Sequence, residues 1–476
     1  MAPKINLLLS LICRVHYAEQ AIDVADVVRN CQTAEMHARV SKFNMMVSLI
    51  HGVLAAIVAP KLGILSDRIG RCPVLAISAI GSLISNLVLI IATKSTSVYG
   101  YRWILVGSFF EGMTGSIAAM MAAAHSYATD CTPAEKRAAA FGLFHASLFA
   151  GMAIGPAFGG YLVKVTGSIL STFYVAFLCQ ILFIIVVLFI IPESVSVQHR
   201  LNARDMHILD AEFNAVRPYT MRKFLRKLNF LEPLRVLVPG GAVRPAVRRN
   251  MQLLASIDTL LIGAGAGGMM VIILYAEFTF GWTSVEAGYF MSLGGTVRAF
   301  GLVVILPFIV KYLKSRDPFG QNHVGASYSD VTLIRFTTVC ELVAFIGFAM
   351  AQTGVQFALA GTLGSIGGIA SPTLQSALTK HVPKENVGAL LGGLSLLHCI
   401  CTIIAPIIFS TVYAYTISWY PRAIFFAFTV LYGLAFFCAT MVKQTLNDSI
   451  YEEDYSERQA TRYELSAPRE AEPHAH

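Results

Sequence analysis

The chain has 476 residues, of which 55% are hydrophobic and only 13% are charged, and its formal net charge is +8. Soluble domains usually carry about 25% charged residues, so a soluble globular protein is disfavoured. The positive charge is the usual consequence of Lys and Arg collecting in cytoplasmic loops of a membrane protein, and it does not indicate nucleic-acid binding.

Apolar stretches of span length recur along the whole chain. Such stretches can cross a bilayer only as helices, because lipid offers no partner for open backbone groups. Eleven full spans are predicted, at residues 41–62, 73–93, 102–125, 139–163, 169–191, 250–274, 285–309, 332–352, 356–377, 387–413 and 421–442. The sequence therefore predicts an all-α, multi-pass membrane protein.

A shorter apolar run, from Ile5 to Cys13, precedes these spans and ends at Arg14. Nine helical residues reach only about 13 Å, less than half the hydrocarbon thickness. We interpret this run as the shortened first helix of a twelve-helix arrangement, without a signal-peptide cleavage site after it.

The nine cysteines are scattered singly, without a CxxC pair or a metal-type Cys/His spacing. This pattern indicates neither a disulfide framework nor a zinc site, and no metal or other cofactor is expected. The sequence also lacks a GxxxxGK[ST] phosphate loop, so ATP-driven transport is not supported.

Basic residues set the expected orientation and divide the chain. Eleven Lys and Arg residues fall in the segment 192–249, which the positive-inside rule places in the cytosol together with the turns near residues 63–71 and 126–138. The expected parts are an N-terminal bundle (1–191), a cytosolic central loop (192–249), a C-terminal bundle (250–442) and a disordered cytosolic tail (443–476).

The two halves resemble each other at a constant separation of 250 residues. The matching pairs are Ser126 and Ser376, Pro133 and Pro383, Glu135 and Glu385, Gly142 and Gly392, and Pro156 and Pro406. The matches fall on the same cytosolic turn and following span of each half. Parallel repeats of six spans characterise one large class of transporters.

The first turn reads GILSDRIGR, residues 63–71. This string resembles the loop signature of the major facilitator superfamily. The resemblance covers about residues 41–442 and implies two pseudo-symmetric six-helix bundles. It also implies a conformational latch that holds the cytosolic side closed, formed by Gly63, Asp67, Arg68, Gly70, Arg71, Asp130 and Arg137. The alternative is an ordinary basic anchor that fixes topology.

A second motif, GMAIGPAFGG at 151–160, contains Gly151, Gly155, Pro156, Gly159 and Gly160. Glycines four residues apart share a helix face and allow close packing of helices. The motif resembles the fifth-span motif of proton-coupled exporters in the same family. A generic packing helix is the alternative.

Four charged residues lie within predicted spans, namely Glu111, Asp258, Arg298 and Glu341. Charges at such depth normally face a cavity or a partner. Glu111 and Asp258 are the preferred proton-binding candidates, with structural acids as the alternative. Glu111 lies in the string SFFEG, residues 108–112. At the corresponding place, drug exporters of the superfamily often carry an RxxQG-like string, with Gln where Glu111 stands.

Arg298 is expected either to attract an anionic substrate or to pair with Asp258. Glu341 is expected to be structural, with Arg335 as a loose partner. His145 and His398 lie deep enough in their spans to join the candidate cavity, although a lone helix histidine is more often a hydrogen-bonding core residue.

The predicted function is secondary active transport of a small organic compound by alternating access, with proton-coupled export preferred and no enzymatic activity. The tetracycline-type and folate branches of the superfamily are the most similar. The alternatives are proton-coupled uptake and, because the first span is incomplete, a non-transporting sensor or scaffold. We expect a monomer, in the plasma membrane or an organelle membrane, with substrate and protons as partners and without nucleic acid.

Overall fold

The computed structural model describes residues 7–8, 11–13, 34–94, 100–198, 200–201, 205, 232–237, 245–282, 284–315, 325–383, 386–417 and 419–443. No β-strand occurs among these residues. Eleven helical segments in them are long and apolar enough to cross a membrane, from Lys42–Ile69 to Ala423–Met441. The prediction of an all-α membrane protein with eleven full spans is confirmed.

The first half of the chain supplies one bundle. Its helices are α3 (Ala34–Ile69), α4 (Arg71–Lys94), η1 (Gly100–Arg102), α5 (Trp103–Met113), α6 (Ser116–Cys131), η2 (Ala134–Lys136), α7 (Arg137–Thr166), α8 (Leu170–Ile185) and the π-helical turn η3 (Val186–Ile190).

The second half supplies the other bundle. Its helices are α11 (Pro245–Phe280), α12 (Ser284–Phe300), the π-helical turn η5 (Gly301–Ile305), α13 (Leu306–Lys314), α14 (Tyr328–Met350), α15 (Gly354–Gly367), α16 (Ala370–Thr379), α17 (Val387–Thr416) and α18 (Ala423–Met441). A short 3₁₀ segment, η4 (Glu232–Leu237), packs against α11 and α17.

The short run before the first full span is part of the N-terminal bundle. Leu7, Leu8, Leu11 and Ile12 are buried in one apolar cluster with side chains of α3, α4 and α5. Cys13 is disulfide-bonded, with its partner outside the described residues. The expectation of a chain without disulfides is therefore wrong at this position, because isolated spacing in sequence does not report which cysteines meet in space.

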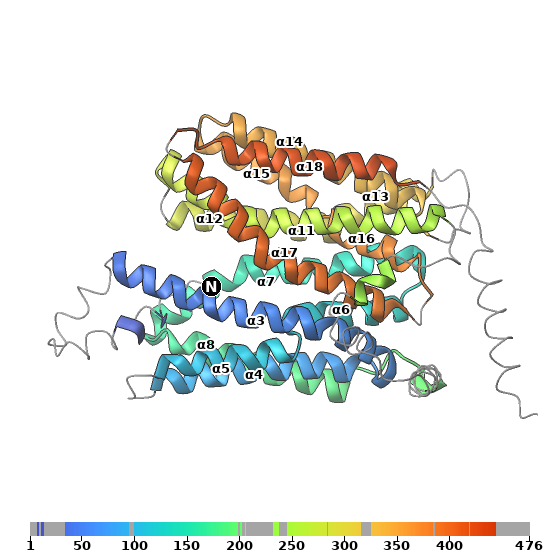
Figure 1. Ribbon diagram of the computed structural model, residues 1–476, viewed down its shortest axis with the longest axis horizontal. Helices are drawn as coiled ribbons and strands as arrows, with labels where there is room; N and C mark the ends of the chain where they lie inside the picture. The colour runs from blue at the N-terminus through green and yellow to red at the C-terminus, as the bar shows by residue number, and fades with distance from the viewer. Residues whose placement is uncertain are drawn as a thin grey trace, which may run out of the picture.

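The two bundles meet along a few helices. In Figure 1, α17 runs obliquely out of the C-terminal bundle and comes to lie beside α3 and α6. On the other side of the interface, α7 packs against α12 and α16. The junction between the bundles is therefore formed mainly by α3, α6 and α7 on one side and by α12, α16 and α17 on the other.

Contact between α3 and α17 is close at one end of the molecule and absent at the other. A Cβ built on Gly63 would lie 2.6 Å from the carbonyl oxygen of Gly388, and one on Gly52 would lie 2.7 Å from Ile403. Further along, α3 and α17 diverge (Figure 1). The exposed side chains there are Met45, Met46, Leu49, Ile404, Ile407 and Ile408.

Two spans are interrupted at corresponding places in the two halves. The span made of α5 and α6 breaks at Gly115, which has a left-handed φ of 73°. The span made of α15 and α16 breaks at Gly368 and Ile369. Interrupted helices at matching positions of two repeats are the usual neighbours of a transporter's binding site.

Candidate functional site

Arg71 organises the turn between α3 and α4. It is the first residue of α4, and its side chain is fully buried. Its Nη1 lies 2.5 Å from Asp67 Oδ1, its Nε lies 2.9 Å from Asp130 Oδ2, and it donates to Ser66 Oγ at 2.6 Å. The structure thus brings together three of the predicted latch residues, and Asp130 on α6 is the acid that Arg71 meets. Arg68 lies in the last turn of α3.

Gly70 lets the chain reverse at this turn, with φ at 107°. The amides of Arg71 and Cys72 then donate to the Glu193 carboxylate at 2.8 and 3.1 Å. A carboxylate is favourable there, because the first amides of a helix carry its positive end. Sequence reasoning missed Glu193, which follows the sixth span and is 122 residues from Arg71.

The same turn touches the opposite bundle. The Asp67 carboxylate lies against the backbone of α17: a Cβ built on Gly388 would lie 2.5 Å from Asp67 Oδ1. Arg137, at the start of α7, donates from Nη1 to the carbonyl of Thr379 on α16 at 3.2 Å. The predicted latch residues therefore sit where the two bundles are closest.

A second polar cluster lies deeper, around Asp258 on α11. Its carboxylate is completely buried, 2.7 Å from Nε2 of His398 on α17, and accepts a weaker hydrogen bond from Ser371 Oγ at 3.4 Å. His145 on α7 lies within electrostatic range of both Asp258 and His398. His145 stacks on His125 of α6, with ring centroids 5.0 Å apart. We define Asp258, His398, His145 and His125 as the Asp–His cluster.

The Asp–His cluster draws on both bundles, since α6 and α7 belong to one and α11 and α17 to the other. Three of its members were predicted as cavity residues. His125 was not, because its position near a predicted span end suggested a shallow site; in the structure α6 carries it into a fully enclosed position.

Glu111 lies elsewhere, on α5 next to the helix break. It is 27% exposed and 3.9 Å from Nε2 of His51, and that nitrogen is 2.6 Å from Ser116 Oγ. The structure does not bring Glu111 together with Asp258. His51 is a residue that sequence reasoning did not select.

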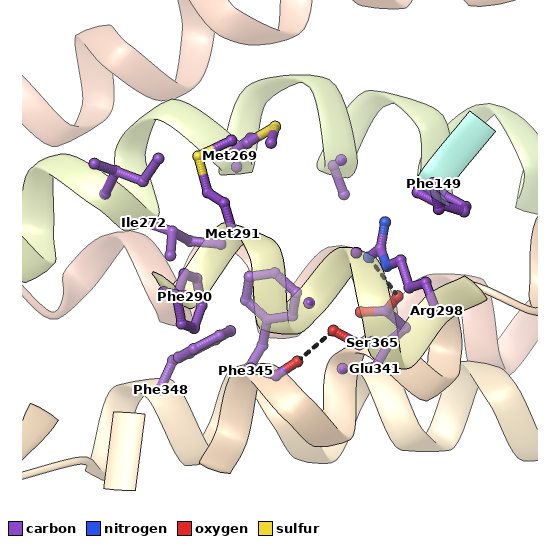
Figure 2. A pocket seen from close by; sticks show the side chains of 18 of the residues that line it. Phe149, Met269, Ile272, Phe290, Met291, Arg298, Glu341, Phe345, Phe348 and Ser365 are labelled. Atoms are coloured by element: carbon purple, nitrogen blue, oxygen red, sulfur yellow. Dashed lines mark hydrogen bonds and ion pairs between the residues drawn. The ribbon is translucent and has the colours of Figure 1, made fainter. Parts of the chain in front are cut away.

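A cavity of about 180 Å³ opens between α7, α11, α12, α14 and α15. Arg298 and Glu341 mark one end of it, with Nη2 and Oε1 3.8 Å apart (Figure 2). The guanidinium of Arg298 also lies over the ring of Phe149, 5.3 Å from its centroid. Aromatic, methionine and isoleucine side chains and several glycines make up most of the rest of the wall.

Among the five predicted cavity residues, Arg298 alone lines this cavity. Glu111 on α5 and Asp258 on α11 do not line it; that they bind protons in a chamber between the bundles stays a prediction. The suggested pairing of Arg298 with Asp258 is wrong: Arg298 pairs with Glu341. Arg335 is not the partner of Glu341, because it donates to backbone carbonyls at the end of α18, such as Ala439.

The glycine motif of α7 does not pack in this structure. A Cβ on Gly151, Gly155 or Gly160 would meet nothing within 4 Å, and one on Gly159 would meet only Thr172, at 3.8 Å. The glycines therefore do not form a close helix contact in this conformation, although Ala153 within the motif lies against α12, where a Cβ built on Gly295 would be 3.3 Å from the Ala153 Cβ. Pro156 lies within α7.

No group of three or more His, Cys, Asp or Glu side chains suited to a metal ion occurs in the part of the chain that the structure describes.

Two membrane-embedded helical bundles, with polar clusters at their junction and a cavity beside it, define a transporter. The chain belongs to the Major Facilitator Superfamily, whose family model matches residues 31–327. It is similar to the MFS-type transporter avaJ of Aspergillus versicolor, with 26% identity, over 89% of this chain and 81% of the relative. It is also similar to the class B tetracycline resistance protein of Escherichia coli, with 26% identity over 83% and 84% of the two chains.

A solved structure supports the same fold. The human organic anion transporter MFSD10 (TETRAN) matches with a TM-score of 0.67 and 17% identity, covering 91% of this chain and 97% of that one.

Proposed function

We propose that this transporter exports a small organic compound by alternating access in exchange for protons. The observation that carries the proposal is the completely buried Asp258 carboxylate held 2.7 Å from the His398 imidazole. Ionisable groups inside a membrane protein are costly and typically belong to ion pathways. A carboxylate and an imidazole in contact can gain or lose a proton, and each change alters the net charge of the pair by one.

The composition of the Asp–His cluster supports coupling of that proton to motion. Asp258 and His398 come from the C-terminal bundle, whereas His145 and His125 come from the N-terminal one. Coulomb interactions are strong in a low-dielectric interior. Any movement that separates α7 from α11 changes the field at Asp258, so the proton affinity differs between the two conformations.

The contacts between the bundles support alternating access. The bundles are closed at the end where Gly63 meets Gly388, which the loop charges predict to be cytosolic, and apart at the other end. A conformation of this kind presents the centre of the molecule to the non-cytosolic side. Transport then requires the Gly63 contact and the Arg71 turn to open.

Relatives support the direction. Several matched proteins are named tetracycline resistance proteins, including classes B and C of Escherichia coli. The glycine motif of α7, which resembles that of proton-coupled exporters, points the same way. For this chain, export remains the proposal that the following measurement tests.

The test uses the full-length protein in liposomes with a pH-sensitive dye inside and a library of small organic compounds. Compound-dependent proton flux is expected in the wild type and is expected to be lost in Asp258→Asn. Glu277→Gln is a matched control, because Glu277 is an exposed acid of the same helix. Flux that survives in Asp258→Asn would contradict the proton site. Protons that move in the same direction as the compound would show symport and would contradict exchange.

A further inference from the structure

We propose that the cavity beside Arg298 binds a flat, single-ring organic anion. The inference rests on the proposed function only in treating that ligand as the transported compound. It concerns a site that is separate from the Asp–His cluster, since the cavity wall contains none of the four cluster residues.

The volume limits the ligand. The cavity holds about 180 Å³, and a dry cavity of roughly 150 Å³ in another protein takes up benzene. One six-membered ring with a short substituent therefore fills the space, whereas a multi-ring compound requires the walls to move.

The walls favour an aromatic ring. The ring-sized and polarisable side chains that line the cavity include Phe149, Phe290, Phe345, Phe348, Met269 and Met291, as Figure 2 shows. Aromatic rings bind each other in offset or edge-to-face contacts, and methionine sulfur packs well against ring edges. Glycines on α11, α12 and α15 supply the space between these side chains.

Two opposite charges line the cavity, and the positive one is the more exposed. The side chain of Arg298 is 36% exposed, whereas that of its partner Glu341 is 8% exposed. Among the residues that the structure describes, Arg298 makes no hydrogen bond to protein; its contacts are the 3.8 Å ion pair and the Phe149 ring. A guanidinium has five N–H donors in a fork that matches a carboxylate.

An entering carboxylate therefore gains direct hydrogen bonds that Glu341 does not make. The stem of Arg298 is held in place, because a Cβ on Gly368, at the break between α15 and α16, would lie 2.9 Å from its Nε. The interrupted span thus positions the cation at the end of the apolar cavity. A cationic ligand in the same place would meet the exposed Arg298 before the more buried Glu341 and is disfavoured.

Gly265 provides a way to fill the cavity without disturbing the fold. It lines the cavity, and a Cβ added to it would meet nothing within 4 Å. Gly288 on α12 is equally open to a Cβ but does not line the cavity. The pair Gly265→Leu and Gly288→Leu therefore separates loss of cavity space from the general effect of a leucine in a span.

The experiment measures equilibrium binding of radiolabelled benzoate to the purified full-length protein in lipid nanodiscs. Saturable binding is expected, with displacement by phenylacetate but not by acetate or benzylamine. Arg298→Gln is expected to weaken binding by about tenfold or more, since a hydrogen bond to a charged group contributes about 1.5–3 kcal/mol. Arg298→Lys should retain part of the benzoate affinity, because it keeps the positive charge. Gly265→Leu should abolish binding and Gly288→Leu should keep it.

Equal displacement by benzylamine, or unchanged binding in Arg298→Gln, would overturn the inference, as would no saturable benzoate binding up to millimolar concentration. The thermal stability of each variant is measured in parallel, and Gly265→Leu tests the site without touching a charge. Proton flux with other compounds but no benzoate binding refutes this site alone. Benzoate binding without proton flux leaves the site standing and refutes the coupling.

Discussion

Asp130 and Lys380 occupy the same position in the two sequence repeats and carry opposite charges. Asp130, near the end of α6, pairs with Arg71 at the start of α4, and Lys380, just after α16, pairs with Asp330 in the first turn of α14 at 2.6 Å. Each pair joins the start of one span to the end of the next, with the polarity reversed between the bundles. The C-terminal pair is buried on both sides, and the side chain of Ser327 also donates to Asp330.

This buried pair predicts a non-additive effect on stability. Removing one partner of a buried ion pair typically costs about 3–5 kcal/mol, because it strands the other charge, whereas replacing both costs much less. Lys380→Met and Asp330→Asn should each lower the thermal unfolding temperature, and the double variant should recover a large part of the loss. Additive losses in a melting series would show that the two side chains do not act as a pair.

Close backbone contact at Gly63 predicts a steric effect on closure. Because a side chain there would run into the carbonyl of Gly388, Gly63→Leu should prevent α3 and α17 from meeting. We expect faster hydrogen exchange in both segments and transport reduced at least about tenfold, since overpacking costs roughly 1–3 kcal/mol. Gly433→Leu, where a Cβ meets nothing within 4 Å, is the control. Unchanged hydrogen exchange around residues 63 and 388 would show that this contact does not control closure of the bundles.

The unpacked glycine face of α7 predicts a variant with a purely functional defect. Gly151 and Gly155 have open space around them in this conformation. Gly151→Leu and Gly155→Leu should therefore leave the thermal stability of the protein unchanged. If the motif packs only when the bundles close at the other end, the same variants should slow turnover. The idea fails if transport by both variants equals that of the wild type.

His381, just beyond the end of α16, predicts a pH dependence of stability. Burial lowers the pKa of its imidazole below the usual 6.5, although its ring nitrogen Nδ1 contacts the carbonyl of Ala377 at 2.7 Å. The unfolded chain therefore binds this proton more readily than the folded one. The stability that the neutral form contributes is complete above pH 6.5 and is lost as the pH falls below that value, by at most about 1.4 kcal/mol per pH unit.

His381→Gln should therefore shrink the drop in unfolding temperature between neutral and mildly acidic pH. Melting curves at several pH values measure it directly, with the wild type as reference. An identical pH profile in the two proteins would assign the acid sensitivity to other groups.

The spans were predictable because hydropathy is a property of each segment by itself, and the predicted and observed bounds differ mostly at the helix ends. The Arg71 turn was predictable because Asp67, Gly70 and Arg71 are neighbours in sequence. Glu193 was not, since it reaches the amides of α4 from a distant loop.

The ion pairs inside the membrane were the least predictable. Which charge meets which depends on the rotation and register of whole helices, and apolar composition does not encode either. Arg298 could face Asp258 or Glu341 equally well by depth alone, and the structure chooses Glu341. The same uncertainty hid the His51 neighbour of Glu111 and left His125 out of the Asp–His cluster.

The central claim is that the two bundles rock about their junction. Paired spin labels at Ala134 and Asn386 report the end where Gly63 meets Gly388, and labels at Val165 and Tyr415 report the other end; all four positions are exposed. With a transported compound and a proton gradient, we predict that the first distance lengthens while the second shortens. Two distances that stay constant, or that change in the same sense, would contradict the account.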